Sequence, residues 1–179
     1  RIFRPPLDST KEEKERFVKK ALNTLSAVAK IGDHPNIHKV YLIPNDYGDI
    51  IEMSDWSETG TLHDFMQQHG AIKKETAFKI CKDIATALRT AHKEGVIHRA
   101  VKPDNVLMMN GIPKLTNFDL SYQLEDNRLT VIADVSQLKD DGYIAPEILA
   151  GEDIDEGTDF FSLGVIAYQL LVGSKPFAS

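Results

Sequence analysis

The sequence predicts an α+β protein with two lobes, in which strands come early and helices come late. Two short strand-like runs lie in the first third of the chain, and runs with helical spacing of apolar residues follow them. The texture changes between Trp56 and Gly60, which divides a first lobe (residues 1–56) from a second (57–179). The chain opens inside a strand-like run and stops at Ser179 without a terminal element, so we expect both lobes to be truncated.

The composition is that of an ordinary globular domain. Of the 179 residues, 42% are apolar and 27% are charged, so a core can form and disorder is not expected. The formal net charge of -6 and the scattered basic residues argue against nucleic acid as a partner, because phosphate binding needs concentrated Lys and Arg. No run approaches the roughly 18 apolar residues of a membrane span, so we expect no membrane segment.

The single cysteine, Cys81, allows no disulfide within the chain. This favours a reducing compartment, and we expect a cytoplasmic location. Cys81 falls on the apolar stripe of a predicted helix, where a buried small hydrophobe is expected and a nucleophile is not.

The first predicted helix begins after Ser9 or Thr10, either of which can act as its N-cap. Glu12 or Glu13, three residues further on, would complete a capping box. Gly32 ends the helix. The apolar residues that recur at helical spacing in between are Phe17, Ala21, Leu22, Leu25 and Ala29.

A hairpin follows this helix. Its strands are expected over residues 40–43 and 49–53, and the turn over 44–48 contains Pro, Asn, Asp and Gly. Beyond the seam, a short amphipathic helix around Phe65 is closed by Gly70, and a longer helix is ended by Gly95. The apolar stripe of the longer helix consists of Ala77, Ile80, Cys81, Ile84, Leu88 and His92.

A second hairpin and a last helix complete the expected elements. Strands are expected over 106–109 and 113–115, and Asn110-Gly111 between them strongly indicates a tight turn. The last helix, over 159–171, is apolar nearly all round, so we expect it to lie buried at the centre of the helical lobe.

The segment 95–107 reads GVIHRAVKPDNVL, which resembles the catalytic loop H-R-D-x-K-P-x-N of Ser/Thr protein kinases. Other segments match that family in the same order: 34–37 (HPNI), 58–62 (ETGTL), 114–119 (KLTNFD, where kinases carry K-[IL]-x-D-F-G), 142–147 (GYIAPE, at the A-P-E motif) and 159–165 (DFFSLGV). The chain therefore resembles a protein kinase domain, in the style of bacterial Ser/Thr kinases, over essentially its whole length. The resemblance implies the two-lobed kinase fold.

The departures from the family pattern fall on the residues that carry the chemistry. In a kinase the Asp of H-R-D orients the substrate hydroxyl and accepts its proton, but the matching residue here is Ala100, whose methyl group does neither. The Asp of D-F-G, which holds Mg²⁺, is matched by Asn117, whose amide oxygen brings no negative charge. Asp119 stands in place of the glycine, and a swap in which Asp119 reaches the metal remains an alternative.

Other positions imply contacts with a nucleotide and a metal ion. By the resemblance, Lys102 would face the transferred phosphate, Asn105 the second metal ion and Leu107 the adenine. The hinge residues that would meet the adenine are Ser54, Asp55, Trp56 and Ser57. We expect the aromatic ring of Trp56 to be partly buried there.

The phosphate anchor of the first lobe is also altered. The resemblance aligns Arg1 with the lysine of the third strand, and the planar guanidinium is not an equivalent anchor. The glutamate that should pair with that lysine aligns with Lys20 or Thr24, neither of which is acidic. The glycine-rich loop would precede Arg1.

Five residues match structural positions of the family. His98 and Phe118 correspond to hydrophobic positions that couple the lobes, and Arg99 follows His98 in the loop motif. Asp159 would accept backbone hydrogen bonds from the catalytic loop. Glu147 matches the A-P-E glutamate, whose Arg partner is expected beyond the end of this chain.

The resemblance leaves three functional interpretations. The first is a pseudokinase that binds, scaffolds or regulates a protein partner or an adjacent domain of the parent chain. The second is an unorthodox Ser/Thr kinase that transfers the ATP γ-phosphate with Asp104, Asp119 or Asp140 in place of the missing acids. The third is a sensor that binds ATP without turnover. ATP and Mg²⁺ are the implied cofactors, with binding weakened or lost.

Overall fold

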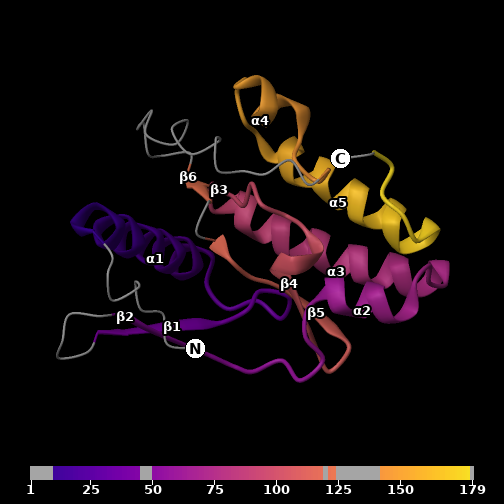
Figure 1. Ribbon diagram of the computed structural model, residues 1–179, viewed down its shortest axis with the longest axis horizontal. Helices are drawn as coiled ribbons and strands as arrows, with labels where there is room; N and C mark the ends of the chain where they lie inside the picture. The colour runs from indigo at the N-terminus through magenta and orange to yellow at the C-terminus, as the bar shows by residue number, and fades with distance from the viewer. Residues whose placement is uncertain (1–9, 45–49, 119–120, 124–141, 178–179) are drawn as a thin grey trace.

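Helices dominate the computed structural model, and the strands among its described residues pair in two-stranded sheets, as an α+β fold predicts (Figure 1). The structure describes residues 10–44, 50–118, 121–123 and 142–177. In chain order the elements are α1 (Lys11–Ile31), β1 (Val40–Pro44), β2 (Ile50–Ser54), α2 (Leu62–His69), α3 (Lys74–Lys93), β3 (Val96–Ile97), the 3-10 turn η1 (Pro103–Asn105), β4 (Val106–Met109), β5 (Ile112–Leu115), β6 (Tyr122–Gln123), α4 (Pro146–Ala150) and α5 (Glu156–Val172).

The N-terminus of α1 is a complete capping box. The Glu13 amide donates to Thr10 Oγ1 over 3.2 Å, and the Thr10 amide donates to Glu13 Oε2 over 2.7 Å. Of the alternatives in the sequence, the structure therefore selects Thr10 and Glu13. At the other end the Gly32 amide donates to the Val28 carbonyl, which confirms that the helix ends there.

The first hairpin pairs β1 with β2 in antiparallel register, with Val40 opposite Ser54. This confirms both strands, although Pro44, predicted to begin the turn, belongs to β1. Residues 45–49 lie outside the described residues. The segment before β1 bonds to β5: the His38 amide donates to the Leu115 carbonyl, and the Leu115 amide donates to the Asn36 carbonyl, each over 2.8 Å. Residues 34–37 thus tie the α1–β1 connection to the second hairpin.

The second hairpin confirms the tight turn predicted from Asn110-Gly111. Both residues have positive φ, +52° and +76°, as the two central residues of a type I′ turn require. β4 and β5 pair with Val106 opposite Leu115. The pairing of β3 with β6, two residues each, was not predicted, because a two-residue strand has too short a pattern to recognise.

The core lies where α3 packs against α5 and the second hairpin (Figure 1). Within it Leu62, Ile84, Leu88 and Ile166 are almost completely buried. Cys81 is half-buried beside this core, and burial raises the pKa of its thiol to about 11. The neutral thiol therefore behaves as a small hydrophobe, as predicted.

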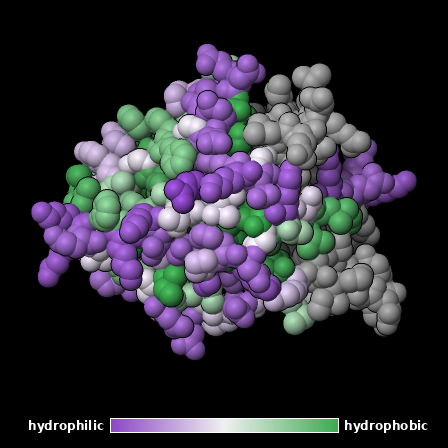
Figure 2. All heavy atoms as spheres, turned by 180° about the vertical axis from the view of Figure 1, so that it is seen from behind, coloured by the Kyte–Doolittle hydropathy of each residue, from purple (hydrophilic) through white to green (hydrophobic). Residues whose placement is uncertain are grey.

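The prediction that the last helix is buried all round was wrong in part. α5 begins at Glu156, with Asp155 as its N-cap, and buries only one face. Its exposed apolar side chains, with exposed fractions between 41% and 53%, are Phe160, Tyr168, Leu171 and Val172. α3 covers α5 from one side, so these side chains on the opposite side of α5 remain exposed. Figure 2 shows hydrophobic residues among polar ones on the side of the molecule where α3 and α5 lie. Within the described residues, no helix is both long and apolar enough to cross a lipid bilayer.

Candidate functional site

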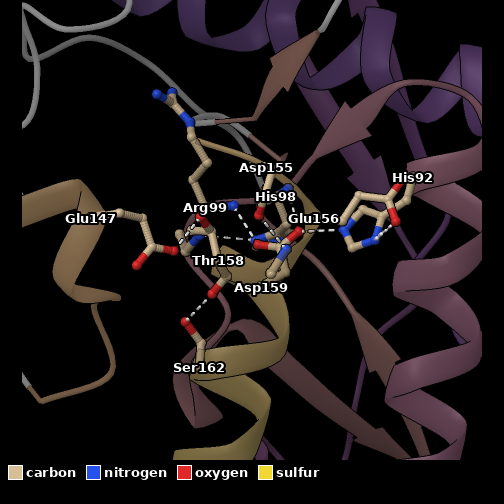
Figure 3. A network of polar contacts seen from close by, with 11 residues as sticks. His92, His98, Arg99, Glu147, Asp155, Glu156, Thr158, Asp159 and Ser162 are labelled. Atoms are coloured by element: carbon tan, nitrogen blue, oxygen red, sulfur yellow. Dashed lines mark hydrogen bonds and ion pairs between the residues drawn. The ribbon is translucent and has the colours of Figure 1, made fainter. Parts of the chain in front are cut away.

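The segment that matches the kinase catalytic loop runs from His98 to Asn105, between β3 and β4. Asp159 of α5, whose carboxylate has no exposed surface, anchors this segment. Asp159 Oδ2 accepts the His98 amide and Oδ1 accepts the Arg99 amide, each over 2.8 Å (Figure 3). The predicted backbone contacts of Asp159 are confirmed. They hold Arg99 at a φ of +63°, a conformation that L-residues seldom adopt.

A third donor to Asp159 comes from α3. His92 Nε2 lies 2.7 Å from Asp159 Oδ2, and both side chains are buried (Figure 3). Glu156 Oε2 lies 3.9 Å from the other ring nitrogen of His92. The sequence placed His92 only on an apolar stripe, and its polar role was missed because its partner lies 67 residues away. His92 and Asp159 thus join α3, α5 and the loop.

The ring of His98 links the loop to the segment after β5. The Ala100 amide donates to His98 Nδ1 over 3.2 Å, so Nδ1 is the acceptor and Nε2 carries the proton. Nε2 in turn donates to the Thr116 carbonyl over 2.9 Å. The His98 ring also meets the edge of Phe118, with 4.6 Å between the ring centres. Both rings are almost completely buried, so the packing predicted for them is confirmed.

Three positions of the expected catalytic and metal chemistry meet at one point. Asn105 Nδ2 donates to the Ala100 carbonyl over 2.8 Å, and Asn117 Nδ2 donates to Asn105 Oδ1 over 3.2 Å. Asn105 is 7% exposed. Asn117 has a φ of +68°, a region that Asn tolerates better than most residues. The sequence identified these three residues as candidates, and the structure adds the hydrogen bonds between them.

These residues do not fit a magnesium ion. Mg²⁺ is usually held in proteins by one or two carboxylates, and this set contains two neutral amides and a methyl group. One amide oxygen, Asn105 Oδ1, already accepts a hydrogen bond. Within the described ranges no three His, Cys, Asp or Glu side chains are grouped to hold a metal ion. Asp119 and Asp140, which could supply a carboxylate, lie outside the described residues, as does Arg1.

The segment after β2, where the resemblance places the hinge, is joined to β4 by hydroxyl groups. Ser57 Oγ lies 2.6 Å from the carbonyl oxygen of Met108 and 2.9 Å from that of Gly60. The Thr59 hydroxyl donates to the same Met108 oxygen. The Met108 amide donates to the Gly60 carbonyl over 2.9 Å. The hinge is therefore fixed to the strand that carries Leu107.

Other candidate nucleotide contacts lie in this region, and the structure corrects the predicted burial of one of them, Trp56. Leu107 in β4 and Ser54 at the end of β2 are half-buried, and Asp55 is exposed. Trp56 was expected to be partly buried, but it is 84% exposed. The expectation was wrong because the neighbouring Ser57 makes the contact with β4, which leaves the indole in solvent. Lys102 is half-buried just before η1.

The segment that matches the A-P-E motif bonds to α5. Thr158 Oγ1 donates to Glu147 Oε1 over 2.6 Å (Figure 3), and Ser162 Oγ donates to the Tyr143 carbonyl over 2.7 Å. Glu147 was expected to find its partner beyond this chain, so its contact with Thr158 was missed. No local pattern marks Thr158 or Ser162, since both look like ordinary helix residues.

One residue of α1 also reaches the site. Asn23 Nδ2 donates to the Ser121 carbonyl over 3.0 Å and lies 3.4 Å from the Phe118 carbonyl. Asn23 stands between Lys20 and Thr24, the two positions aligned with the missing glutamate. An uncharged amide thus links α1 to the segment after Phe118, a contact that the sequence did not indicate.

The comparisons with known proteins agree with this architecture. The model of the protein kinase domain family matches residues 6–179. A probable serine/threonine-protein kinase of Clostridium perfringens is 31% identical over 99% of this chain and 25% of its own length. The Aurora kinase of Schizosaccharomyces pombe is 33% identical over 80% of the chain and 39% of its own length. Probable serine/threonine-protein kinase PknB of Bifidobacterium longum is 28% identical over 84% of the chain and 23% of its own length.

The chain thus spans between about a quarter and two fifths of the length of these curated relatives. ATP and Mg²⁺ are the general cofactors of the family. The match of the family model over nearly every residue, on the α+β architecture described above, places this chain in the protein kinase domain family.

Proposed function

We propose that this chain is a pseudokinase domain, which acts by binding and regulating a protein partner or an adjacent domain of the parent protein. The observation that carries the proposal is Ala100. Its carbonyl and amide are bound to Asn105 and to the His98 ring, as part of an ordered loop, and its side chain is a methyl group. An ordered loop with no proton acceptor at this position supports binding and not phosphoryl transfer.

A positioned general base contributes about 10²–10⁴-fold to a proton-transfer step. A kinase relies on an aspartate at each of two positions. Here Ala100 removes the general base, and the neutral amide of Asn117 removes the charge that holds Mg²⁺. The chain keeps the hydrogen bonds by which Asp159, His92 and His98 hold the loop. A hydrogen-bonded loop that lacks the catalytic aspartate suits a module that acts by binding other proteins.

We propose that the partner is another protein, or another part of the parent chain, that packs against an exposed surface of this domain. The apolar side chains on the open face of α5 are suited to cover by protein, either from the parent chain or from a partner. We propose a cytoplasmic location for the module, supported by its single, half-buried thiol at Cys81.

Transfer of radiolabelled γ-phosphate from ATP tests the proposal. We expect the parent protein to label neither itself nor a generic acceptor protein above background, with Mg²⁺ or Mn²⁺ present. Lys102→Ala and Asn117→Ala are the matched controls, because label that persists in both variants comes from a contaminating kinase. Robust transfer by the parent protein that both substitutions abolish would show an active enzyme and overturn the proposal.

Nucleotide binding without turnover is a second candidate, favoured by the hinge. Ser57 and Thr59 fix the hinge to β4 beside Leu107, so the backbone that would meet an adenine is ordered. If this function holds, ATP should raise the melting temperature of the parent protein, and Leu107→Asp should remove the shift. A melting temperature that ATP leaves unchanged, with and without Mg²⁺, would count against it.

A further inference from the structure

The orientation of two side-chain amides at the candidate site is fixed by their partners. The Ala100 carbonyl can only accept, so Asn105 must present Nδ2 to it, as it does over 2.8 Å. Asn105 therefore turns Oδ1 toward Asn117, which must present its own Nδ2, over 3.2 Å. The acceptor of Asn105 is thus covered by an N–H donor. We call Ala100, Asn105 and Asn117, with these two hydrogen bonds, the amide latch.

Two further hydrogen bonds run beside the amide latch. The Thr116 amide donates to the Asn105 carbonyl over 3.0 Å, and His98 Nε2 donates to the Thr116 carbonyl over 2.9 Å. Since Thr116 precedes Asn117, the loop over 98–105 and the segment after β5 are held together at three neighbouring points. Every group involved is neutral when His98 carries its single proton on Nε2.

We propose that the amide latch takes the structural place of a divalent cation and excludes one from this site. A cation between the two segments would need the oxygen of Asn105, and the latch already places the Asn117 N–H against that oxygen. Release of that oxygen breaks a hydrogen bond, and the three latch residues themselves offer only neutral amide oxygens in return. Mg²⁺ gives up its hydration water reluctantly and is usually paired with carboxylates, so the exchange is unfavourable.

The latch also explains why an asparagine suits this position. Aspartate at 117 would set a carboxylate against Asn105 Oδ1, two acceptors facing each other, a contact that a cation between them would relieve. Asn117 supplies the donor instead and tolerates the positive φ that the chain adopts there. The inference goes beyond the proposed pseudokinase role and concerns the cation alone: a cation response would overturn the latch while leaving partner binding untouched.

Variants at position 117 of the parent protein test the latch with Mn²⁺ as the probe. Asn117→Asp and Asn117→Ala should each lower the melting temperature, by about 2–4 °C for a loss near 1 kcal/mol. Millimolar Mn²⁺ should restore most of that loss in Asn117→Asp and none in Asn117→Ala, whose surface is otherwise the same. Two outcomes would overturn the proposal. In the first, Mn²⁺ raises the melting temperatures of both variants equally. In the second, Mn²⁺ raises the melting temperature of the unsubstituted protein by more than it raises that of Asn117→Ala.

Spectroscopy of the unsubstituted protein gives a test that needs no variant to fold. Paramagnetic Mn²⁺ broadens the NMR signals of nuclei close to its binding site. The latch predicts that the side-chain amide signals of Asn105 and Asn117 stay as sharp on addition of Mn²⁺ as that of Asn36, a buried amide bonded to Pro113. Selective broadening of the Asn105 and Asn117 signals at millimolar Mn²⁺ would show a cation in the site and refute the latch.

Discussion

Replacement of Asp159 by alanine is expected to cost about 3–5 kcal/mol of unfolding free energy, because it strips a buried network of the carboxylate that accepts its hydrogen bonds. Asp159 accepts the His98 and Arg99 amides and the His92 ring, over 2.7 to 2.8 Å, and has no exposed surface. Buried donors left without an acceptor lose their hydration with nothing in return. Since domains are commonly stable by only about 5–15 kcal/mol, this variant should be close to unfolding at room temperature.

Urea unfolding monitored by circular dichroism measures this loss. Asp159→Asn keeps the shape of the side chain but sets an NH₂ group where a donor already points, so it should also be destabilised, by less. Asp153→Ala is the matched control, because Asp153 is exposed and such changes stay within about 0.5 kcal/mol. If Asp159→Ala unfolds at the same urea concentration as the control, Asp159 does not hold the loop.

Phe118→Ala should have an effect of similar size, about 3–5 kcal/mol, through a different mechanism. The ring is 1% exposed and meets His98 edge-on, so its removal leaves a cavity between the loop and the segment after β5. Phe118→Leu, which retains most of the volume, should cost clearly less.

The same urea titrations measure the Phe118 variants. Phe78→Ala is the matched control from α3, since this ring is 71% exposed and its loss leaves no cavity. A loss for Phe118→Ala no larger than that for Phe78→Ala would mean that Phe118 does not couple the loop to its surroundings.

Local chemistry explains which elements were predicted well. The Thr10–Glu13 capping box and the Asn110-Gly111 turn act between residues that are neighbours in sequence, so their signals are complete in a few letters. The spacing of apolar residues predicted α2 and α3. α2 is closed by Gly70 as expected, and α3 ends at Lys93, two residues before Gly95. The two-residue pairing of β3 with β6 carries no such signal.

The candidate site divides in the same way. Its residue types follow from the order of the motifs, so the amino-acid sequence is enough to identify Ala100, Asn105, Asn117 and Asp159. The contacts of His92, Asn23 and Thr158 do not follow from it, because each joins segments that the chain separates and the fold brings together.

The sequence by itself determined the family, the order of the elements and the loss of two acids, at Ala100 and Asn117, because these depend on residue type and spacing. Only the tertiary structure decided which polar groups meet. It exposes Trp56 and one face of α5, buries His92 against Asp159 and turns Asn117 toward Asn105. The physical reason is that burial and hydrogen bonding depend on distances between atoms, which the fold sets between residues far apart in the chain.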